Sequence, residues 1–375
     1  MKTKRIILAM IGASLALEAS PVLAQKLEEI VVTARKREES ILKVPVIASA
    51  LTQEALEKYQ TADIYAVANR VPGFVMGSSV GTVGIQASLR GIGPTSQTAT
   101  VDQSVSLNID GLQLTQGYAF AAGMFDIGQI EVLKGPQALF FGKNSPAGVI
   151  SLRSADPTDE VEVIMRAGNE FEADERVGEL ILSGPVSPAL KLRLATKFSE
   201  MDGFFTNNSD PIPGLGSTPP KHRTFAPSES WIVRGTALFE PNDIYSARAK
   251  LSVVDDRTEG SGGDGQIVAC PDGKGGTPPA NIPFLQDSDC TLDENFQLGD
   301  FDPAFWPGIR NGGVPFIDSN QTFGTLEHDF NFSPELTLTS VTGHYELAQD
   351  NLIRGSGSSN STIAADFTFE NKQFT

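Results

Sequence analysis

The chain has 375 residues, a formal net charge of −17, 40% hydrophobic residues and 20% charged residues. This composition excludes a largely disordered chain, and the length suggests about two to three domains. The acidic balance argues against nucleic acid as a partner, because phosphate binding requires a basic surface, and 2 cysteines are too few for a disulfide-rich scaffold.

The first segment, residues 1–24, has the pattern of a cleaved export signal. A basic start is followed by an apolar stretch at 6–17, and small side chains at Val22 and Ala24 occupy the positions that signal peptidase reads. The apolar stretch is shorter than the about 20 residues that a transmembrane helix requires. We therefore expect cleavage after Ala24, with a buried or amphipathic N-terminal helix as the alternative.

A run of β-branched residues lies inside a charged segment at 25–40. The β-branched residues at 30–33 favour a strand, while charged side chains on both sides cannot follow that strand into an apolar core without cost. An isolated strand with soluble flanks suits pairing with the sheet edge of another protein. An ordinary first strand of the next domain is the alternative, and patterning alone does not separate the two.

Residues 41–155 have the pattern of a compact mixed domain. Helices are expected at 53–59, capped by Thr52, and at 63–69. The segment 91–103 has no apolar period and is rich in Gly, Pro, Thr and Ser, so we expect an exposed loop there. Short strands are expected at 74–76, 85–90, 105–110, 129–133 and 149–153.

Residues 160–375 alternate apolar and polar side chains over about eight segments of about ten residues, the length of a tilted transmembrane strand. Short connections alternate with long ones, which is typical of an outer-membrane barrel. The alternation puts Leu192 on the lipid face and Arg193 in the lumen, and it puts Tyr345 on the apolar face and His344 in the lumen. A soluble β-sandwich, with its polar face outside, is the alternative. Aromatic side chains expected near the membrane boundaries are Trp231, Phe239, Tyr245, Phe330, Phe332 and Tyr345.

An ordered series of short motifs resembles the TonB-dependent outer-membrane receptors. It reads Leu89-Arg90-Gly91, Asn108-Ile109-Asp110-Gly111, Ile130-Glu131-Val132-Leu133-Lys134-Gly135-Pro136-Gln137, Phe141-Gly142-Lys143-Asn144 and Gly148-Val149-Ile150. Ala138, Lys143 and Pro146 depart from the usual residues, which puts one turn in doubt, since glycine reaches backbone angles that alanine does not. The resemblance implies a mixed α/β plug domain followed by antiparallel transmembrane β-barrel strands. The barrel is expected to be incomplete in this chain, because the family implies roughly 22 strands.

The resemblance also implies a function. The expected role is energised uptake of a scarce ligand through the outer membrane of a Gram-negative bacterium, with outer-membrane lipid around the strands. No covalent chemistry is needed, so neither an enzyme nor a cofactor is expected. The default ligand is a metal chelate, a ferric siderophore, while sugars, cobalamin, haem and aromatic compounds stay open. A secreted β-rich binding or adhesion protein without a transport role is the alternative. The segment that would pair with the periplasmic TonB energy-coupling protein, the TonB box, comprises Glu29, Ile30, Val31, Val32, Thr33 and Ala34.

Three further sets of site residues are expected. Arg90 and Glu131 are expected to lock the plug to the barrel wall, with pairing inside the plug as the alternative. Cys270 and Cys290 lie in one long loop of an exported chain and are expected to form a disulfide, with two free thiols as the alternative. Ligand contact is expected at the plug apex, where hydroxyl and amide groups suit an oxygen-rich ligand, although the outer loops of the barrel are an alternative site. The apex residues are Thr95, Gln97, Asp102, Gln103 and Tyr118.

Other motifs carry weaker signals. Gly77-Ser78-Ser79-Val80-Gly81 matches the nucleophile pattern of hydrolases, but a strand or loop follows it where that pattern requires a helix. The acidic segment 287–294 resembles a broken calcium loop, because Leu292 and Leu298 stand at two positions that calcium loops need for glycine and glutamate. The 3 histidines are widely separated, so we expect no metal site.

Overall fold

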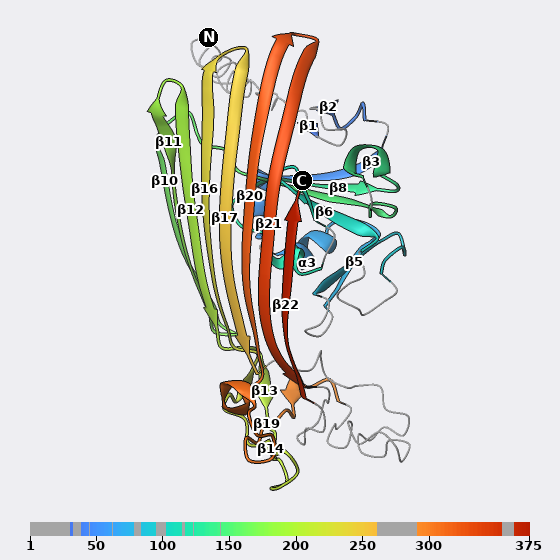
Figure 1. Ribbon diagram of the computed structural model, residues 1–375, viewed down its shortest axis with the longest axis vertical. Coiled ribbons are helices and arrows are strands. Elements are labelled where there is room, and N and C mark those ends of the chain that lie inside the picture. Colours follow the sequence, from blue (N-terminus) through green and yellow to red (C-terminus); the bar gives the residue numbers. More distant parts are fainter. Residues whose placement is uncertain are drawn as a thin grey trace, which may run out of the picture.

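The computed structural model describes residues 31–32, 39–44, 46–61, 63–78, 84–94, 103–114, 117–122, 124–142, 144–260, 291–354 and 364–375. The expected export signal, most of the expected TonB box, the two cysteines and the apex residues Thr95, Gln97 and Asp102 lie outside the described residues. Two units lie side by side: an N-terminal domain that extends to residue 155, and a long antiparallel sheet (Figure 1).

The N-terminal domain is built around a five-stranded sheet with the order β3-β8-β9-β6-β7. Strands β6 and β9 run parallel, and the other neighbours are antiparallel. A hairpin of β4 (Phe74–Ser78) and β5 (Ile85–Leu89) and a short pair of β1 (Val31–Val32) and β2 (Glu39–Ser40) complete the strands of the domain. The five strands of the sheet are β3 (Ile47–Thr52), β6 (Val105–Ile109), β7 (Leu112–Leu114), β8 (Ile127–Lys134) and β9 (Gly148–Ser154).

The two predicted helices begin at capping side chains: Thr52, which was expected as a cap, and Asp63, which was expected as the first residue of its helix. The Thr52 hydroxyl accepts a hydrogen bond from the Ala55 amide at 3.4 Å and starts α2 (Gln53–Lys58). The Asp63 carboxylate accepts one from the Ala66 amide at 2.7 Å and starts α3 (Ile64–Ala68). Both caps satisfy amides that the first helical turn leaves without partners. The short helices α4 (Ala119–Ala122) and α5 (Ala138–Phe141) were not predicted.

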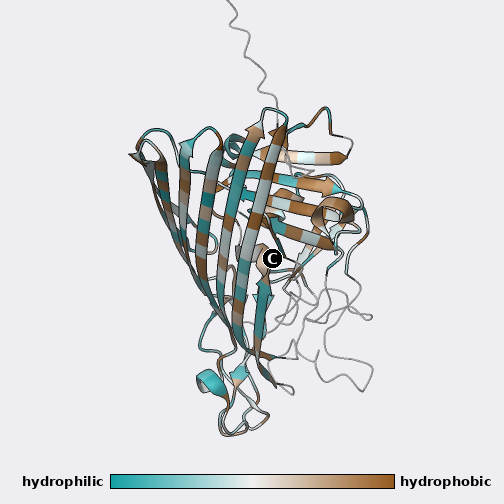
Figure 2. Cartoon of the chain, turned by 45° about the horizontal axis from the view of Figure 1, so that its top comes forward, coloured by the Kyte–Doolittle hydropathy of each residue, from teal (hydrophilic) through white to brown (hydrophobic). Residues whose placement is uncertain are grey.

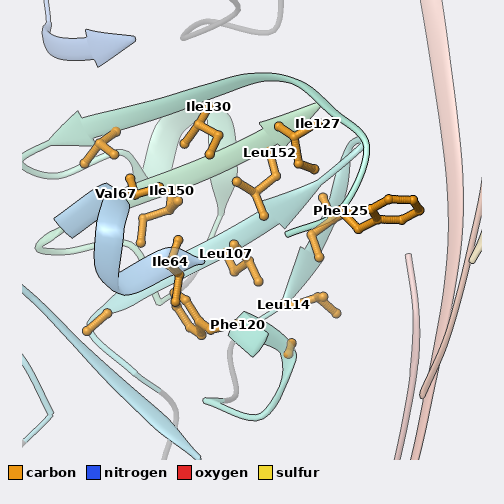
Figure 3. Close-up of a cluster of buried hydrophobic side chains, with 14 of the residues drawn as sticks. Ile64, Val67, Leu107, Leu114, Phe120, Phe125, Ile127, Ile130, Ile150 and Leu152 are labelled. Atoms are coloured by element: carbon orange, nitrogen blue, oxygen red, sulfur yellow. The ribbon is translucent and has the colours of Figure 1, made fainter. Parts of the chain in front are cut away.

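The main core of the domain lies on one face of its sheet, under α2 and α3, and it continues into the long sheet. Figure 3 shows Ile64 and Val67 of α3 beside Leu107, Ile150 and other sheet residues, with Phe125 pointing out of the cluster toward the long strands. Buried side chains of the long sheet belong to the same cluster. The two units therefore share one apolar core across part of their boundary. The long-sheet members are Ile181, Ala195, Ile232, Val254, Phe323, Tyr345 and Leu347.

The long sheet has eight strands in chain order, and β10 and β22 are its two edges, so the sheet does not close on itself. This confirms the expected number of strands. The expected lengths of about ten residues were too short, because β16, β17, β20 and β21 have 15, 15, 18 and 19 residues. The strands are β10 (Glu162–Glu170), β11 (Glu175–Ser187), β12 (Leu190–Met201), β16 (Ser228–Asn242), β17 (Tyr245–Glu259), β20 (Phe316–Ser333), β21 (Leu336–Arg354) and β22 (Ala364–Phe374).

Small elements in the long connections join the strands at the end of the sheet opposite the tight turns (Figure 1). They form a three-stranded sheet of order β15-β13-β18 and a pair of β14 and β19. Their bounds are β13 (Phe205–Asn207), β14 (Ser217–Thr218), β15 (Thr224–Phe225), β18 (Asn295–Phe296), β19 (Asp300–Phe301) and the 3-10 helix η2 (Arg310–Gly313).

Burial in the long sheet is inverted relative to a water-soluble sheet. Along the strands, hydrophobic and hydrophilic residues alternate (Figure 2). Leu192, expected on the lipid face, is 42% exposed, whereas Arg193, expected in the lumen, is 4% exposed and faces the N-terminal domain. The outer face also exposes Val163, Met165 and other large apolar side chains. Water does not favour an exposed apolar band of this extent. Among the described residues, none of the helices has the length and apolar content needed to cross a bilayer.

The expected faces of β21 were wrong. Tyr345 is 1% exposed and donates a hydrogen bond to the Gln321 side chain at 3.0 Å, while the neighbouring His344 points to the exposed side. The inner face of β21 packs on the N-terminal domain, so aromatic and small residues are favoured there. A Cβ added at Gly343 would lie 2.8 Å from the Leu112 side chain. Polarity alternation alone therefore fails where the inner face packs on protein rather than on water.

Candidate functional site

The candidate site is the interface between the N-terminal domain and the long sheet. Three aspartates of the domain meet at one edge of its sheet: Asp110 follows β6, Asp156 follows β9 and Asp126 precedes β8. Parallel strands end at the same edge, and an antiparallel neighbour begins there, so the topology brings all three carboxylates toward the long sheet. Asp110 and Gly111 have φ angles of 49° and 90°, as a tight hairpin turn requires.

The long sheet presents cations to this edge. Arg193 of β12 and Lys250 of β17 lie in one inward-facing row, because both are registered with Thr236 of β16. Arg234 of β16 lies in the next inward row, opposite Ser252. The period of two along a strand sends all three cations to the same face. The interface therefore joins carboxylates from the domain to cations from the sheet.

Arg193 and Asp126 form a buried bidentate pair. The Arg193 Nη2 and Nε atoms lie 2.6 and 2.9 Å from the two carboxylate oxygens, and both side chains are 3% exposed. Arg234 donates to the backbone carbonyl of Phe125 and, at 3.3 Å, to that of Asp126, so it holds the same turn. Bidentate pairing fixes orientation as well as distance. These contacts set the position of the start of β8 against the long sheet.

Lys250 makes a second contact point. Its ammonium lies 3.0 Å from the Asp110 carboxylate and 3.2 Å from the Asp156 carboxylate. It also donates to the carbonyl and hydroxyl of Ser154 at 2.9 and 2.8 Å. Arg248 pairs with Asp156 at 2.9 Å from the same strand. The charge of this buried lysine is therefore compensated by two carboxylates and two neutral oxygens.

The cations around Asp110 and Asp156 lower the pKa values of these two carboxyl groups. Burial raises the pKa of Asp110, but the charges of Lys250 and Arg234 outweigh burial, and the pKa lies below the ordinary 3.8. Burial likewise raises the pKa of Asp156, and the charges of Lys250 and Arg248 again bring it below 3.8. Both carboxylates are therefore ionised when the interface is formed.

The residues expected to form the lock have other surroundings. Arg90 lies exposed in the turn after β5, with a φ angle of 54°. Glu131 is 3% exposed in β8 and accepts a hydrogen bond from the Gln129 side chain at 3.2 Å. A role for either residue in contacts with a barrel wall stays a prediction. The ion pairs described above involve residues that were not expected to lock the plug to the wall.

The apex residues within the described part also pack internally. The side-chain amide of Gln103 makes two hydrogen bonds to β5. Its oxygen accepts from the Ala87 amide at 3.0 Å, and its nitrogen donates to the Ile85 carbonyl at 2.5 Å. The Tyr118 ring lies 5.6 Å from the ring of Phe369 on β22, and burial raises the pKa of the Tyr118 hydroxyl to about 12. Contact of either side chain with a ligand stays a prediction.

The part of the expected TonB box that the structure describes is docked on the N-terminal domain. Val31 and Val32 pair with Ser40 and Glu39 in the β1–β2 ladder. Val32 is fully buried in a second apolar cluster, which includes Leu133 of β8 and Val149 of β9. The strand that was predicted to pair with a partner thus pairs within its own chain. Among the described residues, no group of three or more His, Cys, Asp or Glu side chains could hold a metal ion.

The interface residues could have been found in part from the sequence. Arg193 and Lys250 stand at polar positions of alternating strands, and their inward direction follows from that pattern. Asp110 belongs to one of the family-like motifs. What the sequence did not show was the pairing, because Asp110 and Lys250 are 140 positions apart and the register that joins them is a property of the fold.

Comparison with known proteins identifies the two units. Residues 40–149 match the family model of the TonB-dependent receptor plug domain. The chain contains the plug domain of a TonB-dependent receptor. The five-stranded N-terminal domain is therefore the plug, and the long sheet is part of the wall of the surrounding barrel.

Relatives of known name share modest identity with this receptor chain. The vitamin B12 transporter BtuB of Vibrio vulnificus is 27% identical over 271 residues, which cover 68% of this chain and 40% of the relative. The ferrichrome outer membrane transporter/phage receptor of Escherichia coli is 30% identical over 148 residues, 37% of this chain and 18% of the relative. The chain therefore spans less than half the length of these relatives.

Solved structures agree on the fold. The ferripyoverdine receptor of the outer membrane of Pseudomonas aeruginosa superposes with a TM-score of 0.66 at 15% identity, over 92% of this chain and 41% of that one. The ferric yersiniabactin uptake receptor FyuA of Yersinia pestis gives a TM-score of 0.65 at 14% identity, over 88% of this chain and 44% of that one. At these identities the likeness concerns the arrangement of plug and wall.

Removal of one partner of the buried pair should release the plug from the wall. We expect Asp126→Ala to lower the stability of the docked plug by about 3 kcal/mol, because Arg193 loses its buried bidentate partner and keeps only the more exposed Glu162 carboxylate at 3.4 Å. The double variant Asp126→Leu with Arg193→Met should recover most of the loss. Urea unfolding of the purified receptor measures both. The control is Glu57→Ala, which removes an exposed pair with Arg166 and should cost below about 1 kcal/mol; an equal loss in the control would contradict the assignment.

Docking should also depend on pH. The folded pKa values of Asp110 and Asp156 lie below 3.8, so their stabilisation is complete above the unfolded pKa and is lost as the pH falls through the folded values. We expect the thermal midpoint of the plug to be insensitive to these groups from pH 7 to about 5, and to fall below about pH 4. Asp110→Asn should flatten that acid-side fall. A fall between pH 7 and 5 that Asp110→Asn leaves unchanged would assign the effect to other groups.

Proposed function

We propose that the chain supplies the plug and part of the barrel wall of an outer-membrane transporter for energised ligand uptake. The observation that carries this proposal is the inverted burial of the long sheet, with apolar side chains outside and Arg193, Arg234 and Lys250 buried inside against the plug. Such a sheet is suited to lipid on one face and to a protein-filled lumen on the other. The same observation disfavours a secreted adhesion protein, whose outer face would meet water.

The first ligand to test is a ferric siderophore. Relatives of this chain are named as transporters for ferrichrome and for vitamin B12, and similar structures are named as receptors for ferripyoverdine and ferric yersiniabactin. The proposed ligand is thus a bulky chelate, which is cargo rather than a cofactor of the protein. Uptake would require the periplasmic TonB protein to engage the segment that contains β1. The proposed location is the outer membrane of a Gram-negative bacterium, reached through a cleaved export signal.

The proposed lipid face can be tested with one charge placed on either side of β12. We expect Leu192→Arg to reduce insertion, since a charge on the lipid face costs about 2–4 kcal/mol at the middle of the membrane and less toward its boundaries, and Leu192 lies two positions from the start of β12. Ser199→Arg is the matched control, because Ser199 faces inward on the same strand, in register with Ser230. Insertion is measured as heat-modifiable receptor in the outer-membrane fraction. Equal insertion of the two variants would reverse the assignment of faces.

Transport can be tested at the proposed TonB box. We expect Val31→Pro to abolish energised uptake of iron from candidate ferric siderophores while binding to whole cells is retained, because proline lacks the amide that a strand partner needs. The wild-type chain in a strain that lacks TonB gives the matching reference, with binding but no uptake. Normal uptake by a correctly inserted Val31→Pro variant would show that this segment is not the TonB box.

A further inference from the structure

The plug sheet has two faces, and the strand β1 covers the one that the main core does not use. Along β8, Ile130 and Val132 belong to the main core, so Gln129, Glu131 and Leu133 lie on the opposite face by alternation. Leu133 packs there in the same cluster as Val32 of β1. Two faces of one strand thus serve two purposes: one holds the plug together, and the other receives the N-terminal segment.

One side chain joins β1 to this face by a polar contact. The Gln129 Nε2 atom donates to the Val31 backbone carbonyl at 2.7 Å, across 98 positions of sequence. The same nitrogen donates to the Glu131 carboxylate at 3.2 Å. A primary amide has two N–H bonds, so both contacts form at once. The carboxylate fixes the rotamer of Gln129 and directs the second N–H toward Val31.

Gln129 stands on the part of the plug that the wall holds. It is three positions after Asp126, which Arg193 and Arg234 fix against the long sheet. By contrast, within the part of the chain that the structure describes, the ladder of β1 consists of two residue pairs with β2. The Gln129 contact therefore links a weakly paired segment directly to an anchored strand. Loss of that contact would leave Val32 burial and the short ladder to hold the segment.

We propose that Gln129 and Glu131 form a latch that holds the segment around Val31 and Val32 on the plug until a partner withdraws it. Gln129 supplies the bond, and Glu131 is a positioning residue that orients the Gln129 amide. The inference rests on the proposed function insofar as the withdrawing partner is the TonB protein. The latch itself is a property of this chain alone and can be measured without transport.

The test is hydrogen exchange of the purified receptor in detergent, followed in peptides that cover β1, β2, β6 and β9. Gln129→Leu keeps the side-chain volume close to that of glutamine and removes the donor. We expect exchange in the β1 peptide to rise about five- to tenfold, the factor that one net hydrogen bond represents. Glu131→Gln keeps an acceptor without the charge and should give a smaller rise, about two- to threefold. Gln53→Leu is the matched control on the exposed helix α2 and should leave β1 unchanged.

The outcomes separate the latch from general damage and from the proposed function. Unchanged exchange at β1 in Gln129→Leu overturns the latch, and so does an equal rise in β6 and β9, which would mean that the whole plug is destabilised. A rise confined to β1 and β2 supports it. If that rise is found while Val31→Pro still takes up ligand, the latch stands and the role of the segment in energised uptake is overturned.

Discussion

The charge pairing between the plug and the wall is the constraint on which the rest of the structure depends. Arg193, Arg234 and Lys250 face inward from a sheet whose outer face is apolar. Burial of such cations costs free energy unless carboxylates or other acceptors pair with them. The plug meets Arg193 and Lys250 with aspartates at one edge of its sheet, and it meets Arg234 with the backbone carbonyls of Phe125 and Asp126. The plug can therefore occupy only the orientation in which that edge faces the wall. Apolar contacts of Phe125 and its neighbours then fill the space around the ion pairs.

The combination of ion pairs and apolar contacts with the plug explains why the outer face of the wall is apolar while its inner face carries both charged and apolar side chains. The outer face follows a simple alternation, whereas the inner face meets charged side chains of the plug at some heights and packed apolar side chains at others. Gly343 and Tyr345 illustrate the packed part, where close approach to Leu112 and burial matter more than polarity. Arg193 and Lys250 illustrate the ionic part. The lumen is thus a protein interface as much as a solvent-facing surface.

Much of the fold could be predicted from sequence because its signals are local. Thr52 and Asp63 mark helix starts through their own side chains, and the alternation around Leu192 assigns a face without knowledge of the partner strand. The strand β3 was missed because its sequence, IASALT, has weak strand preference and is held by pairing with β8. The interface pairs were missed for the same reason: they depend on register between distant segments. Arg90 and Glu131 were chosen by motif, which reports resemblance and not contact.

The placement of β1 on the free face of the plug sheet has a mechanical consequence. A force applied to the chain before Val31 acts on the end of β1 at which Val31 pairs with Ser40, so the bonds of the described pairs can break in succession rather than together. The ion pairs of Asp126 and Lys250 with their partners lie later in the chain, so a force that reaches them is distributed over several ion pairs between the plug and the wall. The force needed to separate the chain from its neighbours therefore increases from the N-terminal segment toward the plug sheet. A pull of modest size can free that segment while the strands behind it keep their register.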